Sequence, residues 1–217
     1  MDPTPEPPVP IAVVVLAGGR SSRMGRDKAA VMLHGRRLLD RTLAAAVAVP
    51  GVVEVVVVLA PAQVIPPVRC AAPVTLVRDT TAYQGPLAGI AAGLAGTSRA
   101  EVALVLGCDT PFVQPGLLAL LAARATAGAI VVPVHEGRPQ PLCSAIHFEA
   151  FEAVRALAAG GARAASAIAD DPRALLVQPG EWAAADPEGL SFLGVNTPEE
   201  LARAEALAAR LDGVAGR

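Results

Sequence analysis

The sequence predicts an α/β fold, a single Rossmann-like three-layer α/β/α domain around a mostly parallel sheet. Short β-branched apolar runs recur along the chain, separated by alanine- and leucine-rich stretches of helical length. The runs are apolar at nearly every position, as is typical of strands buried on both faces of a parallel sheet. Apolar residues make up 53% of the 217 residues, so the chain can bury a sizeable core.

The first expected strand, residues 11–16, ends at Ala17-Gly18-Gly19 and therefore leads into a tight loop. The later runs have the same character, and each is short enough to be one strand. Further strands are expected at residues 52–59, 74–77, 102–106, 130–132, 142–148 and 190–195.

The helices expected between these strands cover both faces of the sheet. Pro86 and Pro115 suit a first helical turn, and Gly160-Gly161 breaks a helix. Helices are expected at residues 37–49, 86–96, 115–127, 149–159, 164–169 and 196–210. No repeat or linker divides the chain, so we expect one domain over residues 11–217 and a disordered lead-in, rich in proline and acid, over residues 1–10.

Charge and cysteine content narrow the classes of partner and compartment. The net charge of −2 comes from nearly balanced acids and bases, which favours neither nucleic acid nor an anionic membrane as partner. Three widely spaced cysteines without a CxxC pair indicate a reducing cytoplasm rather than disulfides or zinc. The longest apolar runs are far shorter than the roughly 20 residues that span a bilayer. We therefore expect a cytoplasmic protein that binds small molecules.

The loop over residues 16–28 has the composition of a phosphate-binding loop. It holds three glycines, two serines and four cations directly after the first strand. Glycines let backbone N–H groups approach phosphate oxygens, and Arg23 and Lys28 can neutralise a triphosphate and the departing pyrophosphate. Neither the Walker A pattern nor GxGxxG fits this loop. The alternative is an ordinary solvated loop with glycines at its turns.

Ligands of open α/β sheets bind outside the carboxyl ends of the strands, here after Leu16, Val77, Leu106 and Val195. Asp109 follows one of these ends and is the candidate Mg²⁺ ligand. Mg²⁺ usually keeps several waters, so a single aspartate can suffice as its protein anchor. The alternative for Asp109 is a turn or capping role before a proline.

The motifs together resemble the molybdenum cofactor guanylyltransferases, a MobA-like nucleotidyltransferase family in the wider group that includes sugar-nucleotide pyrophosphorylases. The signature at residues 16–28 is long and specific. The resemblance continues, in the family's order and spacing, through residues 85–90, 108–111, 140–142 and 196–201. It implies a fold of the nucleotide-diphospho-sugar transferase type and transfer of GMP from GTP to the phosphate of molybdopterin, with release of pyrophosphate.

The resemblance also implies roles for individual residues. Catalysis is expected from Lys28, Arg23 and Asp109, with Asp109 as the Mg²⁺ ligand. Asp79 gains weight only from the resemblance, because an isolated loop aspartate forms a turn about as often as it touches a ligand. The substrate-binding residues are expected to be Leu16, Ala17, Gly18, Gly19, Lys28, Asp79 and Asp109. Expected partners are GTP, molybdenum-molybdopterin, molybdoenzymes and cofactor-assembly proteins, and the chain is expected to be a monomer or a weak homo-oligomer.

The chain departs from the family after the second strand. Many relatives carry there an asparagine that helps hold the nucleotide, whereas this chain has Val57-Val58-Leu59-Ala60. Leu16-Ala17-Gly18-Gly19 resembles the guanylyl branch more than the cytidylyl branch. Three alternatives remain: a CTP-dependent cytidylyltransferase, a nucleotidyltransferase for another phosphorylated acceptor such as a sugar phosphate or phospholactate, and a catalytically silent nucleotide-binding partner of molybdoenzyme assembly.

Several other residues could take either a functional or a structural role. The histidines lack metal-ligand spacing, which favours surface or packing roles. Trp182 could stack on a pterin or simply pack. The residues that could face either the acceptor or solvent are Arg138, Gln140 and Arg163.

Overall fold

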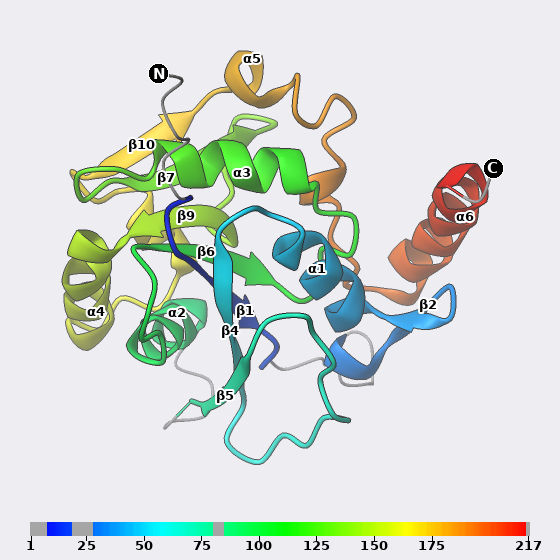
Figure 1. Ribbon diagram of the computed structural model, residues 1–217, viewed down its shortest axis with the longest axis horizontal. Helices are drawn as coiled ribbons and strands as arrows, with labels where there is room; N and C mark the ends of the chain where they lie inside the picture. Colours follow the sequence, from blue (N-terminus) through cyan, green and yellow to red (C-terminus); the bar gives the residue numbers. More distant parts are fainter. Residues whose placement is uncertain (1–7, 19–27, 80–84, 216–217) are drawn as a thin grey trace, which may run out of the picture.

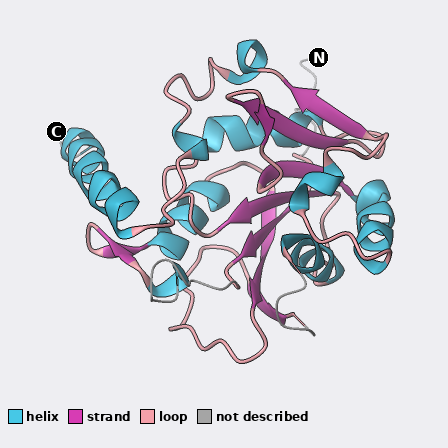
Figure 2. Ribbon diagram, turned by 180° about the vertical axis from the view of Figure 1, so that it is seen from behind, coloured by secondary structure: helices cyan, strands magenta, loops and turns pink. Residues whose placement is uncertain are grey.

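The computed structural model describes residues 8–18, 28–79 and 85–215 and confirms the predicted α/β fold. Within these residues an eight-stranded sheet has the order β10-β7-β9-β6-β1-β4-β5, with β8 beside β7 (Figures 1 and 2). Neighbouring strands are parallel except where β9 or β8 takes part. The strands are β1 Ile11–Leu16, β4 Val52–Leu59, β5 Val74–Arg78, β6 Val102–Gly107, β7 Ile130–His135, β8 Arg138–Pro139, β9 Cys143–His147 and β10 Ala174–Val177.

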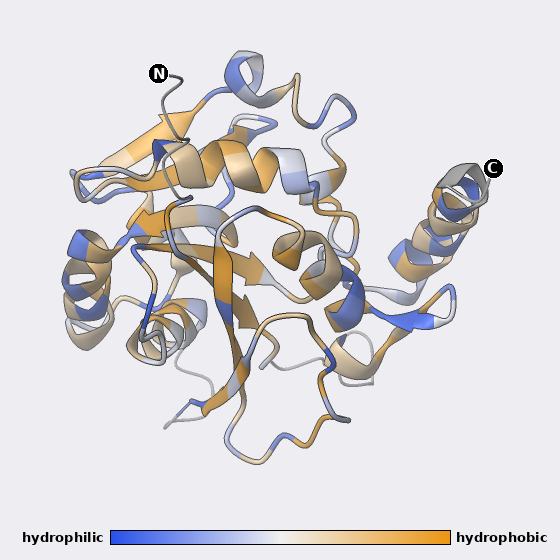
Figure 3. Ribbon diagram, viewed as in Figure 1, coloured by the Kyte–Doolittle hydropathy of each residue, from blue (hydrophilic) through white to orange (hydrophobic). Residues whose placement is uncertain are grey.

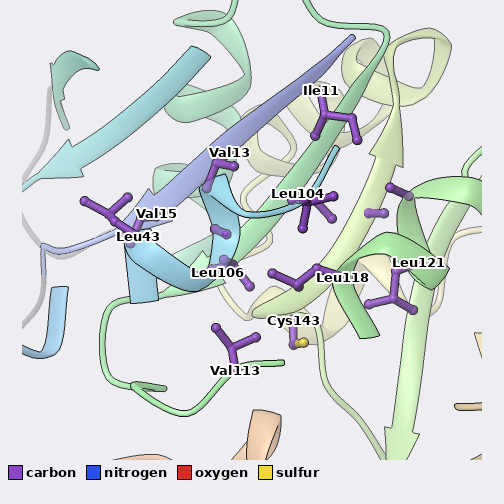
Figure 4. Close-up of a cluster of buried hydrophobic side chains, with 14 of the residues drawn as sticks. Ile11, Val13, Val15, Leu43, Leu104, Leu106, Val113, Leu118, Leu121 and Cys143 are labelled. Carbon is purple, nitrogen blue, oxygen red and sulfur yellow. The ribbon is translucent and has the colours of Figure 1, made fainter. Parts of the chain in front are cut away.

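Helices cover both faces of the sheet, as predicted. The apolar central strands are the orange arrows of Figure 3. Alternate residues of β1 face opposite layers, because Val13 and Val15 belong to one buried cluster and Val14 to the other. The first cluster, shown in Figure 4, includes residues of α1 (Leu38–Val47) and α3 (Pro115–Arg124). The second includes residues of α2 (Pro86–Ala95) and α4 (Phe151–Ala159).

A smaller unit beside the sheet joins the segment after Lys28 to the C-terminal helix. The hairpin of β2 (Met32–Leu33) and β3 (Arg36–Arg37) lies next to α6 (Pro198–Ala215), as Figure 1 shows. The backbone N–H of His34 donates to both carboxylate oxygens of Glu205, each at 3.0 Å, and Arg41 donates to Asp212 at 2.7 Å. A third apolar cluster fills the contact with Val31, Leu33, Leu38, Phe112, Val195, Ala204 and Ala208.

The prediction of a strand at residues 190–195 is wrong. A 3-10 turn, η4 (Leu190–Phe192), occupies its first half. Gly189 takes a φ of 64°, and the Asp186 carboxylate accepts from the N–H groups of Leu190 at 3.0 Å and Ser191 at 2.8 Å. These bonds start a turn, so the apolar side chains pack without joining the sheet.

The remaining predicted elements lie within a few residues of their expected bounds, while β2, β3, β8, β10 and α5 (Pro179–Trp182) were not expected. The other 3-10 helices are η1 (Lys28–Ala30), η2 (Phe148–Ala150) and η3 (Ala165–Ile168). No helix within the described ranges is long and apolar enough to cross a membrane. Most of the predicted lead-in, residues 1–7, lies outside these ranges.

Candidate functional site

A cavity of about 560 Å³ opens at the carboxyl ends of β1, β4, β5 and β6, where the sequence predicts the ligand site. Its walls come from the residues that follow these strands and from the N-terminal turn of α2. Six of the predicted site residues line it: Leu16, Ala17, Gly18, Lys28, Asp79 and Asp109. Predictions for Gly19 and Arg23 concern residues outside the part of the chain that the structure describes.

Lys28 and Asp109 meet at one side of this cavity. The Lys28 Nζ lies 3.0 Å from Asp109 Oδ2 and donates to Asn196 Oδ1 at 2.5 Å. The lysine side chain is 23% exposed and the aspartate side chain 24%, so both remain accessible from the cavity. Asp109 and Asn196, which lie 81 and 168 positions after Lys28 in the sequence, thus both contact its ammonium group.

The backbone around Asp109 fixes the position of its carboxylate. Cys108 N–H donates to the carbonyl of Leu16 at 3.1 Å, which ties this turn to the end of β1, and the Asp109 carbonyl accepts from Val195 N–H at 2.8 Å. A Cβ at Gly107 would lie 2.5 Å from Asp109 Oδ1. Glycine therefore leaves the space that the carboxylate occupies.

Asn196 is a site residue that the sequence does not predict. The backbone N–H groups of Asn196 and Thr197 donate to Glu200 Oε2 at 2.5 and 3.1 Å, and Glu200 N–H donates to Thr197 Oγ1 at 3.2 Å. This reciprocal pattern is a capping box at the start of α6. Its sequence signal is the motif at residues 196–201, which carries part of the family resemblance and predicts a helix start but assigns no role to Asn196 itself.

The loop after β1 lies against the end of β4. The N–H groups of Ala17 and Gly18 both donate to the carbonyl of Val58, at 2.9 and 3.0 Å. A Cβ at Gly18 would lie 2.6 Å from Ala60 N, so no larger residue fits there without a shift of backbone. On the far side of β4, the half-buried Asp79 donates its N–H to the Leu59 carbonyl at 2.9 Å.

Another part of the cavity wall is the N-terminal turn of α2. Gly85 has a φ of 100°, and a Cβ there would lie 2.4 Å from the carbonyl oxygen of Arg163. That oxygen accepts from Leu87 N–H at 3.2 Å. Residues of this first helical turn line the cavity, and the positive end of the helix dipole favours an anionic ligand there.

Some of the residues with two open interpretations have packing roles in the structure. Trp182 is only 5% exposed and its Nε1 donates to the Val134 carbonyl at 3.1 Å, so its role is packing. His135 stacks on Phe192 with ring centroids 4.6 Å apart, and His147 is buried. Arg138 and Arg163 are exposed.

A family model described as a MobA-like NTP transferase domain matches residues 13–174. The chain belongs to this family. The matched range contains both Lys28 and Asp109, whereas Asn196 lies beyond its end. The predicted enzyme class, a nucleotidyltransferase, is confirmed.

Individual relatives agree with this family. A protein of Chloroflexus aggregans named "Probable molybdenum cofactor guanylyltransferase" is 34% identical over 199 residues, covering 89% of this chain and 92% of the relative. The crystal structure of molybdopterin-guanine dinucleotide biosynthesis protein A from Archaeoglobus fulgidus superposes with a TM-score of 0.71 at 24% identity, covering 92% of this chain and 99% of that one.

A cytidylyltransferase has a similar fold. The 2-C-methyl-D-erythritol 4-phosphate cytidylyltransferase of Thermus thermophilus superposes with a TM-score of 0.66 at 27% identity, covering 92% of this chain and 99% of that one. The fold of the nucleotide-diphospho-sugar transferase type is therefore confirmed, and it is shared by enzymes with different nucleotides.

Proposed function

We propose that this protein transfers GMP from GTP to the phosphate of molybdopterin, forming the guanine dinucleotide cofactor and releasing pyrophosphate. The observation that carries the proposal is the convergence of Lys28 and Asp109 in a cavity beside Ala17 and Gly18. The names of the relatives identify nucleotide and acceptor, and the 34% identical relative covers most of the chain.

In this proposal the cavity holds the nucleotide. Residues Leu16 to Gly19 contact it from the end of β1, and Asp79 contacts it from the end of β5. Lys28 and Arg23 neutralise the phosphates. The N-terminus of α2 adds a favourable field for negative charge.

Asp109 is the residue that we propose as the ligand of Mg²⁺. Its carboxylate lines the cavity and is a quarter exposed. Among the described residues no group of three or more His, Cys, Asp or Glu side chains could hold a metal. A single carboxylate fits Mg²⁺, which usually binds one or two carboxylates together with waters and phosphate oxygens. When bound, Mg²⁺ neutralises charge on the phosphate oxygens of the nucleotide.

The chemistry requires little beyond positioning and charge. A phosphate oxygen of the acceptor attacks the α-phosphorus of GTP; a new P–O bond forms while the bond to pyrophosphate breaks. The attacking phosphate monoester is already largely ionised near neutral pH, so no general base is needed. Lys28 and Arg23 stabilise the negative charge of the departing pyrophosphate.

The proposal extends to the setting of the enzyme. We place it in the cytoplasm, which suits its free cysteines Cys70, Cys108 and Cys143. We also propose that residues 11–217 form one domain, active as a monomer or weak homo-oligomer, which passes its product to molybdoenzymes or cofactor-assembly proteins.

The test is pyrophosphate release from GTP, CTP, ATP and UTP with Mg²⁺, with and without molybdenum-loaded molybdopterin. We expect release from GTP that depends on the acceptor. A preference for CTP would make the enzyme a cytidylyltransferase. GTP binding without release would make it a silent partner or direct the search to another acceptor, such as a sugar phosphate or phospholactate.

A further inference from the structure

The long connection between β4 and β5, visible in Figure 1, begins with a turn that forms part of the cavity wall. Ala60 and Pro61 of this turn line the cavity. The half-buried Gln63 reaches back across it with both ends of its amide. Its Oε1 accepts from Ala60 N–H at 2.9 Å, and its Nε2 donates to the carbonyl of Ala17 at 2.9 Å. One side chain thus joins the ends of β1 and β4.

The same turn is held from its other side by β5. Arg78, the last residue of that strand, donates from Nη1 to the carbonyls of Ala60, Pro61 and Gln63 at 3.3, 3.1 and 2.8 Å. Asp79, the next residue, lines the cavity. The turn at residues 60–63 is therefore a spacer between two parts of the wall, the loop after β1 and the start of the loop after β5.

The packing at this spacer leaves little freedom. The Ala60 backbone is so close to Gly18 that a Cβ on the glycine would overlap it. The one hydrogen on Ala60 N is donated to Gln63, and the N–H groups of Ala17 and Gly18 are donated to Val58. These three N–H groups thus shape the wall of the cavity and are engaged within the protein.

We propose that Gln63 is a positioning residue for nucleotide binding, which fixes the width of the cavity by holding Ala60 against Ala17. The inference rests on the proposed function for the identity of the ligand. Only a side chain with both an acceptor and a donor at its end can satisfy Ala60 N–H and the Ala17 carbonyl together.

The first test variant, Gln63→Leu, has similar size but can neither donate nor accept. The second, Gln63→Glu, keeps an acceptor for Ala60 N–H and places a carboxylate oxygen against the Ala17 carbonyl. Gln114→Leu is the matched control, because Gln114 is also half-buried and its amide donates to the nearby Phe112 carbonyl at 2.7 Å. Gln114 does not line the cavity.

Four quantities are measured: the Kd of Mg²⁺–GTP by calorimetry, kcat and KM by pyrophosphate release, and the hydrogen-exchange rate of the Ala60 amide by NMR. For Gln63→Leu we expect the Kd and KM to rise about tenfold, the factor that corresponds to about 1.4 kcal/mol. We expect kcat to change less than about threefold and Ala60 exchange to accelerate. Gln63→Glu should weaken GTP binding in the same direction, and Gln114→Leu should match the wild type.

The outcomes separate this inference from the proposed function. A wild-type protein that binds no GTP overturns the proposed function and this inference with it. If the wild type binds GTP and both Gln63 variants bind it within twofold as well, the inference alone is overturned. Equal losses in Gln114→Leu would likewise overturn it, because the effect would then be unspecific. If Gln63→Leu does not fold, the Kd of Mg²⁺–GTP for Gln63→Glu alone decides whether Gln63 positions the nucleotide site.

Discussion

Replacement of Lys28 by methionine is the sharpest test of the site. Methionine retains much of the aliphatic chain and removes the ammonium group, which lies 3.0 Å from Asp109 and also bonds Asn196. Loss of one preorganised donor at a site of developing charge costs about 10²- to 10³-fold in kcat. We expect acceptor-dependent pyrophosphate release to fall by that factor.

The same replacement should hardly affect folding. Both side chains of the ion pair are about a quarter exposed, at 23% and 24%, and pairs near the surface contribute only about 0–1 kcal/mol. A change of 1 kcal/mol shifts the Tm of a chain of this size by about 2–4 °C. The Lys28→Met protein should therefore melt within about 4 °C of the wild type.

The assay is pyrophosphate release from Mg²⁺–GTP with molybdenum-loaded molybdopterin, and calorimetry supplies the Tm. Arg124→Met is the control, because Arg124 forms an ion pair with Glu181, Nη1 to Oε1 at 2.5 Å, that is more exposed and does not line the cavity. We expect the control to turn over at the wild-type rate. A Lys28→Met rate within tenfold of the wild type, or an equally slow Arg124→Met, would refute the reasoning.

Three further predictions concern the site and the pH dependence of stability. Asn196→Ala removes one hydrogen bond that holds Lys28, so kcat should fall about tenfold, less than in Lys28→Met, in the same assay. Burial, with the charge of Asp186, raises the pKa of the Cys143 thiol from 9.0 to about 12. The thiol ionises at lower pH in the unfolded chain than in the folded one, so the free energy of unfolding should fall as pH rises from 9 towards 12, by at most about 1.4 kcal/mol per pH unit. Urea titrations over this pH range should show a shallower fall for Cys143→Ala than for the wild type. Burial raises the pKa of Glu54, but hydrogen bonds from the backbone N–H groups of Arg99 and Ser98 to its carboxylate outweigh this effect and hold the pKa below 4.5. This stabilisation is present above pH 4.5 and lost as pH falls through the folded pKa, so Glu54→Gln should show a smaller loss of stability in acid, measured by urea titration at about pH 7 and about pH 3.5.

Most of the strands that the sequence predicts correctly are fully buried, and the exception is β5, which lies at an edge of the sheet. In β1 and β6 almost every position is apolar because both faces are covered, so the run itself is the signal. β10 has only four apolar residues, a run too short to stand out, and it lies at the edge of the sheet, where Leu175 and Leu176 are 44% and 38% exposed. Its pairing with β7 depends on tertiary structure that no local pattern encodes.

The apolar run at residues 190–195 predicts a strand that the structure does not contain. It has the composition of a strand, yet the carboxylate of Asp186 binds the first two N–H groups of the run and starts a turn. A single side chain four residues upstream thus overrides the preference of the whole segment. Such competition between a side chain and a backbone ladder cannot be inferred from hydrophobic periodicity.

A site residue could be predicted from the sequence where it lies at the end of a predicted strand. Leu16 ends one buried strand and Asp109 follows another. A parallel sheet brings such strand ends together at one edge, so their meeting follows from the fold class. Asn196 follows no strand. It reaches Lys28 because Val195 N–H binds the Asp109 carbonyl and the capping box starts α6 at this point.

The contact between α6 and the β2–β3 hairpin adds a physical consequence. Lys28 precedes the hairpin and Asn196 precedes α6. The two residues that share a hydrogen bond therefore lie just before two elements that pack against each other. Val31 and Leu33 on one side and Ala204 and Ala208 on the other are buried together. The bonds of Glu205 to His34 and of Asp212 to Arg41 fasten the same pair of elements. The position of the lysine ammonium therefore depends on a helix that lies outside the sheet and beyond the matched family range, which is why sequence motifs around the cavity alone do not define the site.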